Sequence, residues 1–248
     1  MNREVKRNDG FWKTRSQHYN ELEWVNHRLY LDEFIEAGSF RKSDIVLDVG
    51  TGTGIVAHAV SPFVKEVIGL DKSQDMLEHS NWRGNMYFIK RDIFSPIFAD
   101  GVFDKITCRQ VFHHILRYRQ RAIDECYRIL RKGGVMVFSE GVPPTKRVRK
   151  EYIEIFRLKE KRVTFYEEDL ERLMKKSGFR EIKAKIIYLK NMSVRNWLNK
   201  SGLPKPIQEK IYLLHKDAPD YFKRDYNMTE RDNDCLIDMK MAIFTGRK

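Results

Sequence analysis

The sequence of 248 residues lacks most features that mark secreted, disulfide-stabilised or membrane-spanning proteins. Its three cysteines, Cys108, Cys126 and Cys235, are odd in number and far apart, so they offer neither a disulfide framework nor the spacing of a metal site. No apolar run approaches the length that spans a bilayer. Residues 1–10 are charged and lack the apolar core of a signal peptide. We therefore expect a cytoplasmic protein without a membrane span.

Tandem repeats and low-complexity segments are absent as well. A chain of this length is long enough for one large α/β domain with its own core. We expect a single domain over residues 1–248, with a helical cap in residues 1–40 and a helical insertion or lid in residues 191–237.

The charge is unbalanced toward the basic side, with a formal net charge of +12. Such an excess suits RNA, a membrane surface or a phosphorylated substrate, but a solvated basic surface explains it equally well. No RNA-binding module is recognisable. The densest basic stretch, residues 146–162, holds eight Lys or Arg residues and three Glu residues, interleaved with apolar positions. It indicates either a core-packed helix with a charged outer face or an anion-binding wall beside a ligand.

The sequence does contain a glycine-rich turn between a strand and a helix. Residues 45–49 are mostly apolar and β-branched, which is typical of a strand buried on both faces. Gly50, Gly52 and Gly54 follow, and residues 55–60 begin a helix whose N–H groups would point at a ligand. The spacing of these glycines is G-x-G-x-G. Dinucleotide-binding folds have the pattern G-x-G-x-x-G, and the position of its last glycine is occupied here by Ile55. A strand–helix corner would explain these glycines without a ligand.

Acidic residues lie at the ends of three successive predicted strands. A simple strand–helix corner does not require acidic residues at these positions. Asp48 precedes the turn, Asp71 ends the strand over residues 65–71, and Asp92 ends the strand over residues 85–92. A carboxylate at the tip of the second strand is placed to accept both hydroxyls of a ribose. The third acid can receive the exocyclic amino group of an adenine. The pattern therefore predicts an adenosine-binding site.

Together, the segments Asp48–Gly54, Gly69–Asp71 and Arg91–Ile93 resemble the cofactor site of class I S-adenosylmethionine (SAM)-dependent methyltransferases. The nearest resemblance is to the small-molecule (type 11) branch typified by ubiquinone/menaquinone-biosynthesis methyltransferases, and it covers roughly the first two-thirds of the chain. It implies a Rossmann-like α/β fold with a mostly parallel seven-stranded sheet, helices on both faces and a helical insertion before the last strand. It also implies SAM as methyl donor, S-adenosylhomocysteine as product, and no metal.

The resemblance further implies which residues bind the cofactor. The glycines would hold the methionine end, Asp71 the ribose, and Asp92 with Ile93 the adenine. Tyr19 and His18 are candidates for a lid, although Tyr19 serves equally well as a packing residue, and Met76 has a similar core alternative. The full set expected at the cofactor is Tyr19, Asp48, Gly50, Thr51, Gly52, Gly54, Asp71, Lys72, Met76, Asp92, Ile93, Arg109 and Gln110.

The ends of the fourth and fifth predicted strands supply candidates for catalysis. His113 and His114 follow the strand over residues 101–110, and Glu140 ends the strand over residues 135–140. A histidine there can remove a proton from an incoming hydroxyl or amine, because its pKa lies near neutrality. Each residue also has a structural alternative, as a helix cap or a solvated loop carboxylate. We expect all three near the methyl acceptor.

The first functional hypothesis is methyl transfer from SAM by in-line displacement to a small molecule, either anionic or aromatic. One alternative keeps the donor and methylates RNA such as tRNA, but no Asn/Asp-Pro-Pro-aromatic segment follows the fourth strand. Another is a non-catalytic SAM-binding or scaffold protein. A dinucleotide-dependent oxidoreductase is disfavoured by the glycine spacing.

Overall fold

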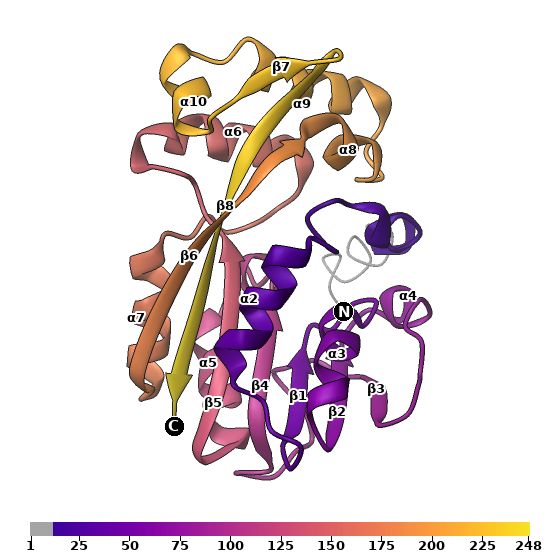
Figure 1. The fold of residues 1–248 in the computed structure, drawn as a ribbon, viewed down its shortest axis with the longest axis vertical. Helices are drawn as coiled ribbons and strands as arrows, with labels where there is room; N and C mark the ends of the chain where they lie inside the picture. The colour runs from indigo at the N-terminus through magenta and orange to yellow at the C-terminus, as the bar shows by residue number, and fades with distance from the viewer. Residues whose placement is uncertain (1–11) are drawn as a thin grey trace.

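The structure, a computed structural model, describes residues 12–248. Within this range an eight-stranded sheet has the order β3-β2-β1-β4-β5-β8-β6, with β7 paired to β8 (Figure 1). The strands are β1 (Ile45–Val49), β2 (Glu66–Asp71), β3 (Met86–Lys90), β4 (Phe103–Arg109), β5 (Leu130–Gly141), β6 (Arg180–Ser193), β7 (Thr229–Arg231) and β8 (Asp234–Arg247). The first five strands run parallel, whereas β8 is antiparallel to β5 and β6. The expected count of seven strands omitted β7, a three-residue strand that lies inside the segment predicted to be helical.

Helices cover both faces of the sheet, as expected for parallel strands that are buried on each side. The helices from residue 19 onward are η1 (Tyr19–Glu21), α2 (Arg28–Gly38), α3 (Ile55–Val60), η2 (Ser61–Phe63), α4 (Gln74–Leu77), η3 (Phe112–His114), α5 (Arg119–Ile129), η4 (Lys146–Val148), α6 (Arg149–Lys159), α7 (Glu167–Ser177), α8 (Val194–Asn199), α9 (Lys205–Lys216) and α10 (Asp220–Asp225). One apolar core joins α5 and α7 to the sheet, and a second core joins α2 and α3 to the opposite face.

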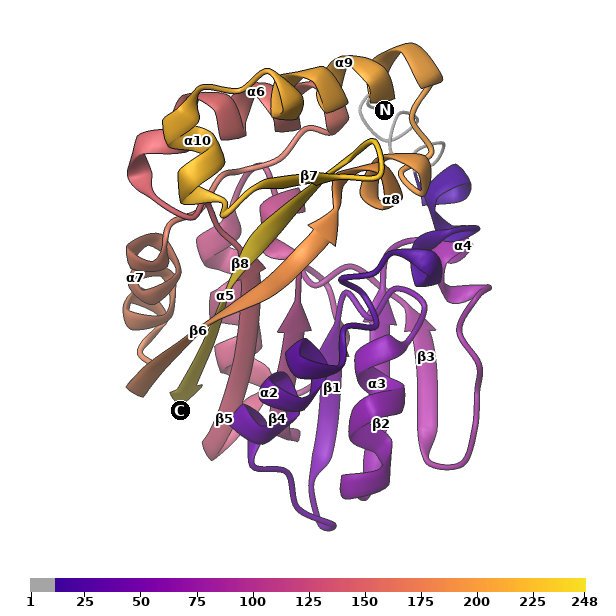
Figure 2. The same cartoon turned by 45° about the horizontal axis from the view of Figure 1, so that its top comes forward.

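A separate layer lies beyond the carboxyl ends of the parallel strands (Figures 1 and 2). It consists of α6, α8, α9, α10 and β7, together with the distal ends of β6 and β8. Its own apolar core includes Tyr152 from α6, Leu198 from α8, Ile211 from α9 and Phe222 from α10. Residues 191–237 therefore pack against α6 through buried apolar side chains, and this packing accounts for most of their aromatic residues.

The strand order reverses beside β1, since β2 and β3 lie on one side of it and β4 and β5 on the other. In open α/β sheets this reversal leaves a crevice outside the carboxyl ends of the strands, where ligands bind. The glycine turn that follows β1 lies at this point. Among residues 12–248, no helix is long and apolar enough to cross a membrane. All three cysteines are buried and unpaired.

Candidate functional site

The glycine turn holds the backbone against two neighbouring side chains. Gly50 and Gly52 adopt left-handed backbone angles, with φ of +67° and +57°. A Cβ at Gly50 would lie 2.3 Å from the Val111 side chain, and one at Gly52 would lie 2.9 Å from Met76. The backbone N–H of Gly50 donates to the carbonyl of Leu70 on β2 at 2.7 Å. These two positions have room for backbone only, as a turn that lies against a ligand requires.

Asp48 is a buried carboxylate at the end of β1 with one oxygen uncommitted. Its Oδ1 accepts a hydrogen bond from the Thr107 hydroxyl at 2.7 Å. Its Oδ2 is also buried and has no hydrogen-bond partner among the described residues. Burial raises the pKa of Asp48 to about 6. A carboxylate in this state favours a ligand that brings hydrogen-bond donors or positive charge.

Asp71 and Asp92 are held in place by backbone N–H groups. Asp71 accepts from Gly52 at 2.9 Å and from Ser73 at 2.8 Å, and burial raises its pKa. Asp92 accepts from the N–H of Phe94 at 3.0 Å. Because each carboxylate has about four lone-pair sites, both acids retain acceptors for hydroxyl or amino groups of a ligand.

A pocket of about 1140 Å³ lies at the carboxyl ends of the parallel strands and joins most of the predicted residues. The predicted residues that line it are Tyr19, Asp48, Gly50, Thr51, Gly52, Asp71, Lys72, Met76, Asp92, Ile93, Arg109, Gln110 and His114. Further lining residues that the sequence did not name individually include Trp12, Val111, Ile115, Leu116, Arg117 and Tyr118, together with Glu160 and Lys161 from the basic stretch over residues 146–162. We call the part near the glycine turn the donor end, and the part near His114 and Glu160 the acceptor end.

Three predicted site residues lie behind this lining. Gly54 is the N-cap of α3, and a Cβ there would meet the ring of Phe88 at 2.9 Å. His113 and Glu140 are buried and contact each other. The structure therefore places these three residues where they support the pocket wall, without facing its interior.

The N-terminal segment closes one side of the pocket. Tyr19 lines the pocket, and the adjacent Asn20 accepts a hydrogen bond from the Thr53 hydroxyl of the glycine turn at 2.6 Å. His18 is not part of the lining, and its Nδ1 lies 2.6 Å from Glu21 at the surface. Tyr19 thus borders the pocket and also packs edge-on against Trp24, with ring centroids 5.9 Å apart, whereas His18 lies outside the lining.

Arg109 and Gln110 connect the end of β4 to α2 and the residues before it. Arg109 donates to the carbonyl of Val25 at 3.0 Å. Gln110 has a left-handed φ of +60°, donates to the Tyr30 hydroxyl at 2.9 Å and accepts from the N–H of Gly141 at 3.1 Å. Arg109 and Gln110 thus line the pocket and also hold the end of β4 against α2 and the residues before it.

Glu140 holds the turn that carries the two histidines. Its Oε1 accepts from the backbone N–H of Phe112 at 2.6 Å and of His113 at 3.2 Å, and its Oε2 lies 2.6 Å from His113 Nδ1. Burial raises the pKa of Glu140 to about 7 and lowers the pKa of both histidines well below the usual value. His114 faces the pocket and packs edge-on against Trp12, with ring centroids 4.9 Å apart.

A buried charge cluster surrounds Glu160, whose side chain lines the acceptor end, and its basic members lie behind the lining. Glu160 is within 2.6 Å of Arg15, 2.9 Å of Lys159 and 3.5 Å of Arg162. Burial opposes ionisation of Glu160, but the basic side chains of Lys159, Arg15 and Arg162 hold its pKa well below the usual range. Burial lowers the pKa of Lys159 to about 7. The basic stretch over residues 146–162 was the only sign of this cluster in the sequence, because Arg15 is 145 positions away from its partner.

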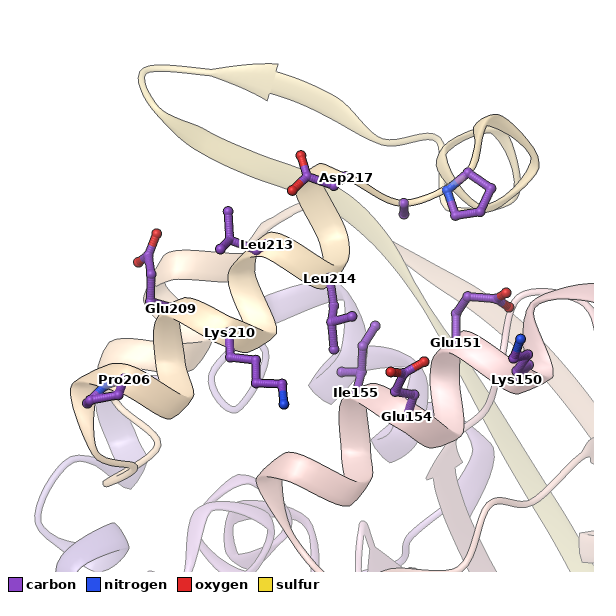
Figure 3. A pocket seen from close by; sticks show the side chains of 12 residues that line it. Lys150, Glu151, Glu154, Ile155, Pro206, Glu209, Lys210, Leu213, Leu214 and Asp217 are labelled. Carbon is purple, nitrogen blue, oxygen red and sulfur yellow. The ribbon is translucent and has the colours of Figure 1, made fainter.

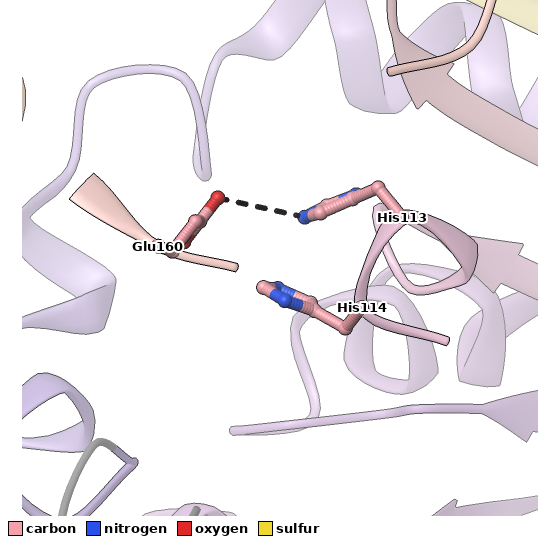
Figure 4. A group of neighbouring side chains, drawn as sticks. All are labelled: His113, His114 and Glu160. Carbon is pink, nitrogen blue, oxygen red and sulfur yellow. Dashed lines mark ion pairs between the residues drawn. The ribbon is translucent and has the colours of Figure 1, made fainter. Parts of the chain in front are cut away.

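His113, His114 and Glu160 lie close enough to be tested as a metal site (Figure 4). Their ligand atoms are within 4.8 Å of one another, and Glu140 supports His113 from behind as a carboxylate often supports a metal-binding histidine. The sole carboxylate of this group already contacts three cations, however, which repel a metal ion. The residues therefore fit a cation poorly.

A second hollow, of about 580 Å³, lies between α6 and α9 (Figure 3). Its lining includes Glu151 and Ile155 from α6 and Lys210 and Leu214 from α9. The glycine turn and the strand-end carboxylates are not part of it. The chemistry-bearing residues are thus concentrated in the larger pocket.

Comparisons with known proteins agree with this arrangement. A family model described as "Methyltransferase domain" matches residues 47–138. The chain is 26% identical to the uncharacterized methyltransferase YcgJ of Bacillus subtilis over 224 residues, which covers 86% of this chain and 88% of that protein. It is 40% identical to the demethylmenaquinone methyltransferase of Thermotoga maritima over 107 residues, 41% of this chain. That match spans 46% of the relative, or about half its length.

Solved structures share the fold. The YcgJ crystal structure matches with a TM-score of 0.79 and 24% identity, covering 90% of this chain and 99% of that one. A phosphoethanolamine N-methyltransferase from Haemonchus contortus, in complex with S-adenosylhomocysteine, matches with a TM-score of 0.63 and 20% identity, covering 95% of this chain and 57% of that one. The motifs and these similarities show a methyltransferase domain over residues 47–138, and the chain as a whole has the fold of SAM-dependent methyltransferases.

Proposed function

We propose that this enzyme methylates a small molecule bound at the acceptor end of the pocket. The observation that carries the proposal is the continuity of one pocket of about 1140 Å³ between the strand-end carboxylates and His114. Ligand pockets commonly measure about 300–1,000 Å³, so this one has room for a nucleoside-sized donor and a small acceptor together. Aromatic and apolar side chains from Trp12, Ile115 and Tyr118 line the acceptor end.

The donor end suits SAM in two respects. Gly50 and Gly52 form a cradle that a Cβ would fill. The unpaired oxygen of Asp48 is a buried acceptor with no protein cation hydrogen-bonded to it, so it suits the positively charged methionine end. Asp71 would hold the ribose, and Asp92 with Ile93 would hold the adenine. The remaining predicted contacts, from Tyr19, Thr51, Lys72, Met76, Arg109 and Gln110, belong to the same proposal.

When bound, SAM supplies an electrophilic methyl group on a positively charged sulfur. The task of the protein is to align the acceptor atom and to exclude water. Tyr19 and Trp12 cover the pocket from the N-terminal side. His114 lines the acceptor end and can accept a hydrogen bond or a proton from an acceptor hydroxyl or amine, although burial lowers its pKa and so weakens it as a base. Glu140 and His113 then act as positioning residues that fix the turn carrying His114.

The acceptor end favours a small molecule over the RNA alternative. The segment around Tyr19 and the residues around Glu160 both border the pocket, so an acceptor must enter between them, and an RNA acceptor would have to insert a single unstacked base. The net charge of +12 is the one observation that favours RNA. Contacts to phosphates make RNA binding strongly dependent on salt. The RNA alternative would therefore be removed if bulk tRNA does not bind, or if its affinity does not change with salt.

The first experiment is calorimetric titration of the full chain with SAM and with S-adenosylhomocysteine. We expect micromolar affinity for both. Transfer of a labelled methyl group to a panel of small acids, amines and phenols then tests the acceptor. Folded, ligand-free protein that binds neither compound would refute the proposal. Binding without turnover across the panel would favour the non-catalytic alternative.

A further inference from the structure

We propose that Glu160 determines which acceptors bind, because its carboxylate accepts a hydrogen bond from a neutral hydroxyl or amino group of the methyl acceptor. This inference rests on the proposed function and narrows the acceptor class to alcohols, phenols and neutral amines. Its structural basis is the position of Glu160, a carboxylate that lines the acceptor end beside His114.

The two oxygens of Glu160 differ in their contacts. Oε2 accepts hydrogen bonds from Arg15 at 2.6 Å and from Lys159 at 2.9 Å, and these occupy both of its lone pairs. Oε1 lies 3.5 Å from Arg162 Nη1 and 3.9 Å from His113 Nε2, distances that are long for a hydrogen bond. It has no other hydrogen-bond or ion-pair partner within the described residues 12–248. Oε1 therefore retains capacity for a donor that a ligand brings.

Burial makes this spare capacity energetically important. The Glu160 side chain is only 3% exposed, so water has little access to its oxygens. Burial opposes ionisation, but Lys159 and Arg15 hold the pKa of Glu160 well below its usual range, so at neutral pH the group acts only as an acceptor. Hydrogen bonds to an ionised acceptor are stronger than those between neutral groups. A ligand with an O–H or N–H directed at Oε1 therefore gains affinity over one without such a donor.

His114 shares the acceptor end with Glu160 (Figure 4). A ring nitrogen of His114 and a carboxylate oxygen of Glu160 lie within 4.8 Å of each other. A single hydroxyl or amino group can contact both atoms at this separation, because hydrogen bonds measure about 2.7–3.2 Å. The group that donates to Glu160 would then lie beside the histidine that the proposed function places at the acceptor atom.

The surroundings of Glu160 favour a neutral donor over a charged one. Arg15, Lys159 and Arg162 already contact the carboxylate. Arg15 also lies over the ring of Trp12, with 5.6 Å from Cζ to the ring centroid. An ammonium group on the acceptor would meet these cations, and a carboxylate on the acceptor would meet Glu160 itself. A neutral hydroxyl or amino group avoids both repulsions.

The test uses small aromatic probes and the full chain, with saturating S-adenosylhomocysteine to occupy the donor end. Phenol and aniline are neutral hydrogen-bond donors at neutral pH, anisole has the same ring without a donor, and benzylamine carries an ammonium group. Ligand-observed NMR titrations measure the four affinities. We expect phenol or aniline to bind about tenfold more tightly than anisole and more tightly than benzylamine. The phenol and aniline arms separate a hydroxyl acceptor from an amine acceptor.

A conservative variant assigns the preference to Glu160. Glu160→Asp keeps the negative charge among the buried cations but withdraws the carboxylate by one methylene group, so the ratio of anisole to phenol dissociation constants should fall several-fold. Glu154→Asp, the same substitution at an exposed position of α6, is the matched control and should keep the wild-type ratio. Because a general loss of packing weakens both probes alike, the ratio separates recognition from a purely structural role. The wild-type titrations apply even if Glu160→Asp does not fold.

The outcomes distinguish this inference from the proposed function. If wild-type protein binds phenol and aniline no more tightly than anisole, if benzylamine binds most tightly, or if Glu160→Asp and Glu154→Asp give the same ratio, the role of Glu160 is refuted. Transfer of a labelled methyl group together with any of these results would leave the proposed function standing. If S-adenosylhomocysteine does not bind but a preference that depends on Glu160 remains, the hydrogen-bonding site stands and the methyl-donor assignment fails.

Discussion

The donor and acceptor ends of the pocket are built in different ways. The donor end consists of backbone at a crowded glycine turn and of carboxylates at the ends of adjacent parallel strands. The acceptor end is bordered by side chains from distant segments, such as Trp12, His114 and Glu160. The first end is rich in hydrogen-bond acceptors, whereas the second depends on side-chain contacts between segments that are far apart in the sequence. If the proposed function holds, the methyl donor and the acceptor would therefore be bound by two differently built ends of one pocket.

The largest expected effect is at the glycine turn. Gly50→Ala should weaken SAM binding by about a hundredfold or more, because its Cβ would lie 2.3 Å from Val111 and the turn must move. Gly84→Ala is the matched control, since Gly84 also has a positive φ of +58° but a Cβ there meets nothing within 4 Å. Calorimetry on both variants measures the difference. Equal affinities for SAM would show that the backbone at Gly50 is not part of the donor end.

Asp71 is expected to give the next largest effect. Asp71→Ala should weaken SAM binding tenfold or more, because it removes a charged acceptor from the donor end and frees the N–H groups of Gly52 and Ser73. Glu78→Ala, an exposed carboxylate at the end of α4, serves as the control. Unchanged affinity in Asp71→Ala would remove this residue from the site.

Asp48 should make donor binding depend on pH. Its pKa is raised by burial to about 6, so the carboxylate that attracts a cationic ligand forms as the pH rises through this value. SAM affinity should therefore increase several-fold between about pH 5 and pH 7. Asp48→Asn should reduce the increase of SAM affinity with pH. A smaller increase should remain in this variant, because burial also raises the pKa of Asp71. A slope that is identical in both proteins would contradict the role of Asp48.

The contrast between the two ends also explains what the sequence could predict. The glycine spacing and the acids at strand ends are local patterns, and Asp48, Asp71 and Asp92 all line the pocket as expected. Their contact with SAM stays a prediction. Gly54 belongs to the same local pattern, but the pattern does not reveal that it faces Phe88 behind the turn.

The acceptor end was less predictable because its contacts join distant parts of the chain. The basic stretch over residues 146–162 indicated a charged surface or an anion-binding wall, but it did not reveal Arg15 as a partner of Glu160. The packing of Trp12 on His114 likewise has no local signature. The strand β7 was missed for a related reason, since three residues paired to β8 show no periodicity of their own.

Substitution of Glu140 is expected to have the smallest effect on cofactor binding, and it tests whether the two ends of the pocket are independent. It supports the acceptor end from behind, so Glu140→Gln should leave the affinity for S-adenosylhomocysteine within about twofold of the wild type. Glutamine keeps an oxygen for the N–H groups of Phe112 and His113 but does not ionise.

The effect of Glu140→Gln should appear in the pH dependence of unfolding. Burial raises the pKa of Glu140 from 4.5 to about 7, so the folded state binds more protons than the unfolded state between these values. The stability that Glu140 contributes is thus fully present below about pH 4.5 and is lost as the pH rises toward 7. Urea unfolding of both proteins from pH 5 to pH 8 should show the wild type losing stability relative to Glu140→Gln as the pH rises. A constant difference would mean that Glu140 has the same protonation state in the folded and unfolded chains, and a parallel loss of affinity for S-adenosylhomocysteine would mean that the two ends are coupled.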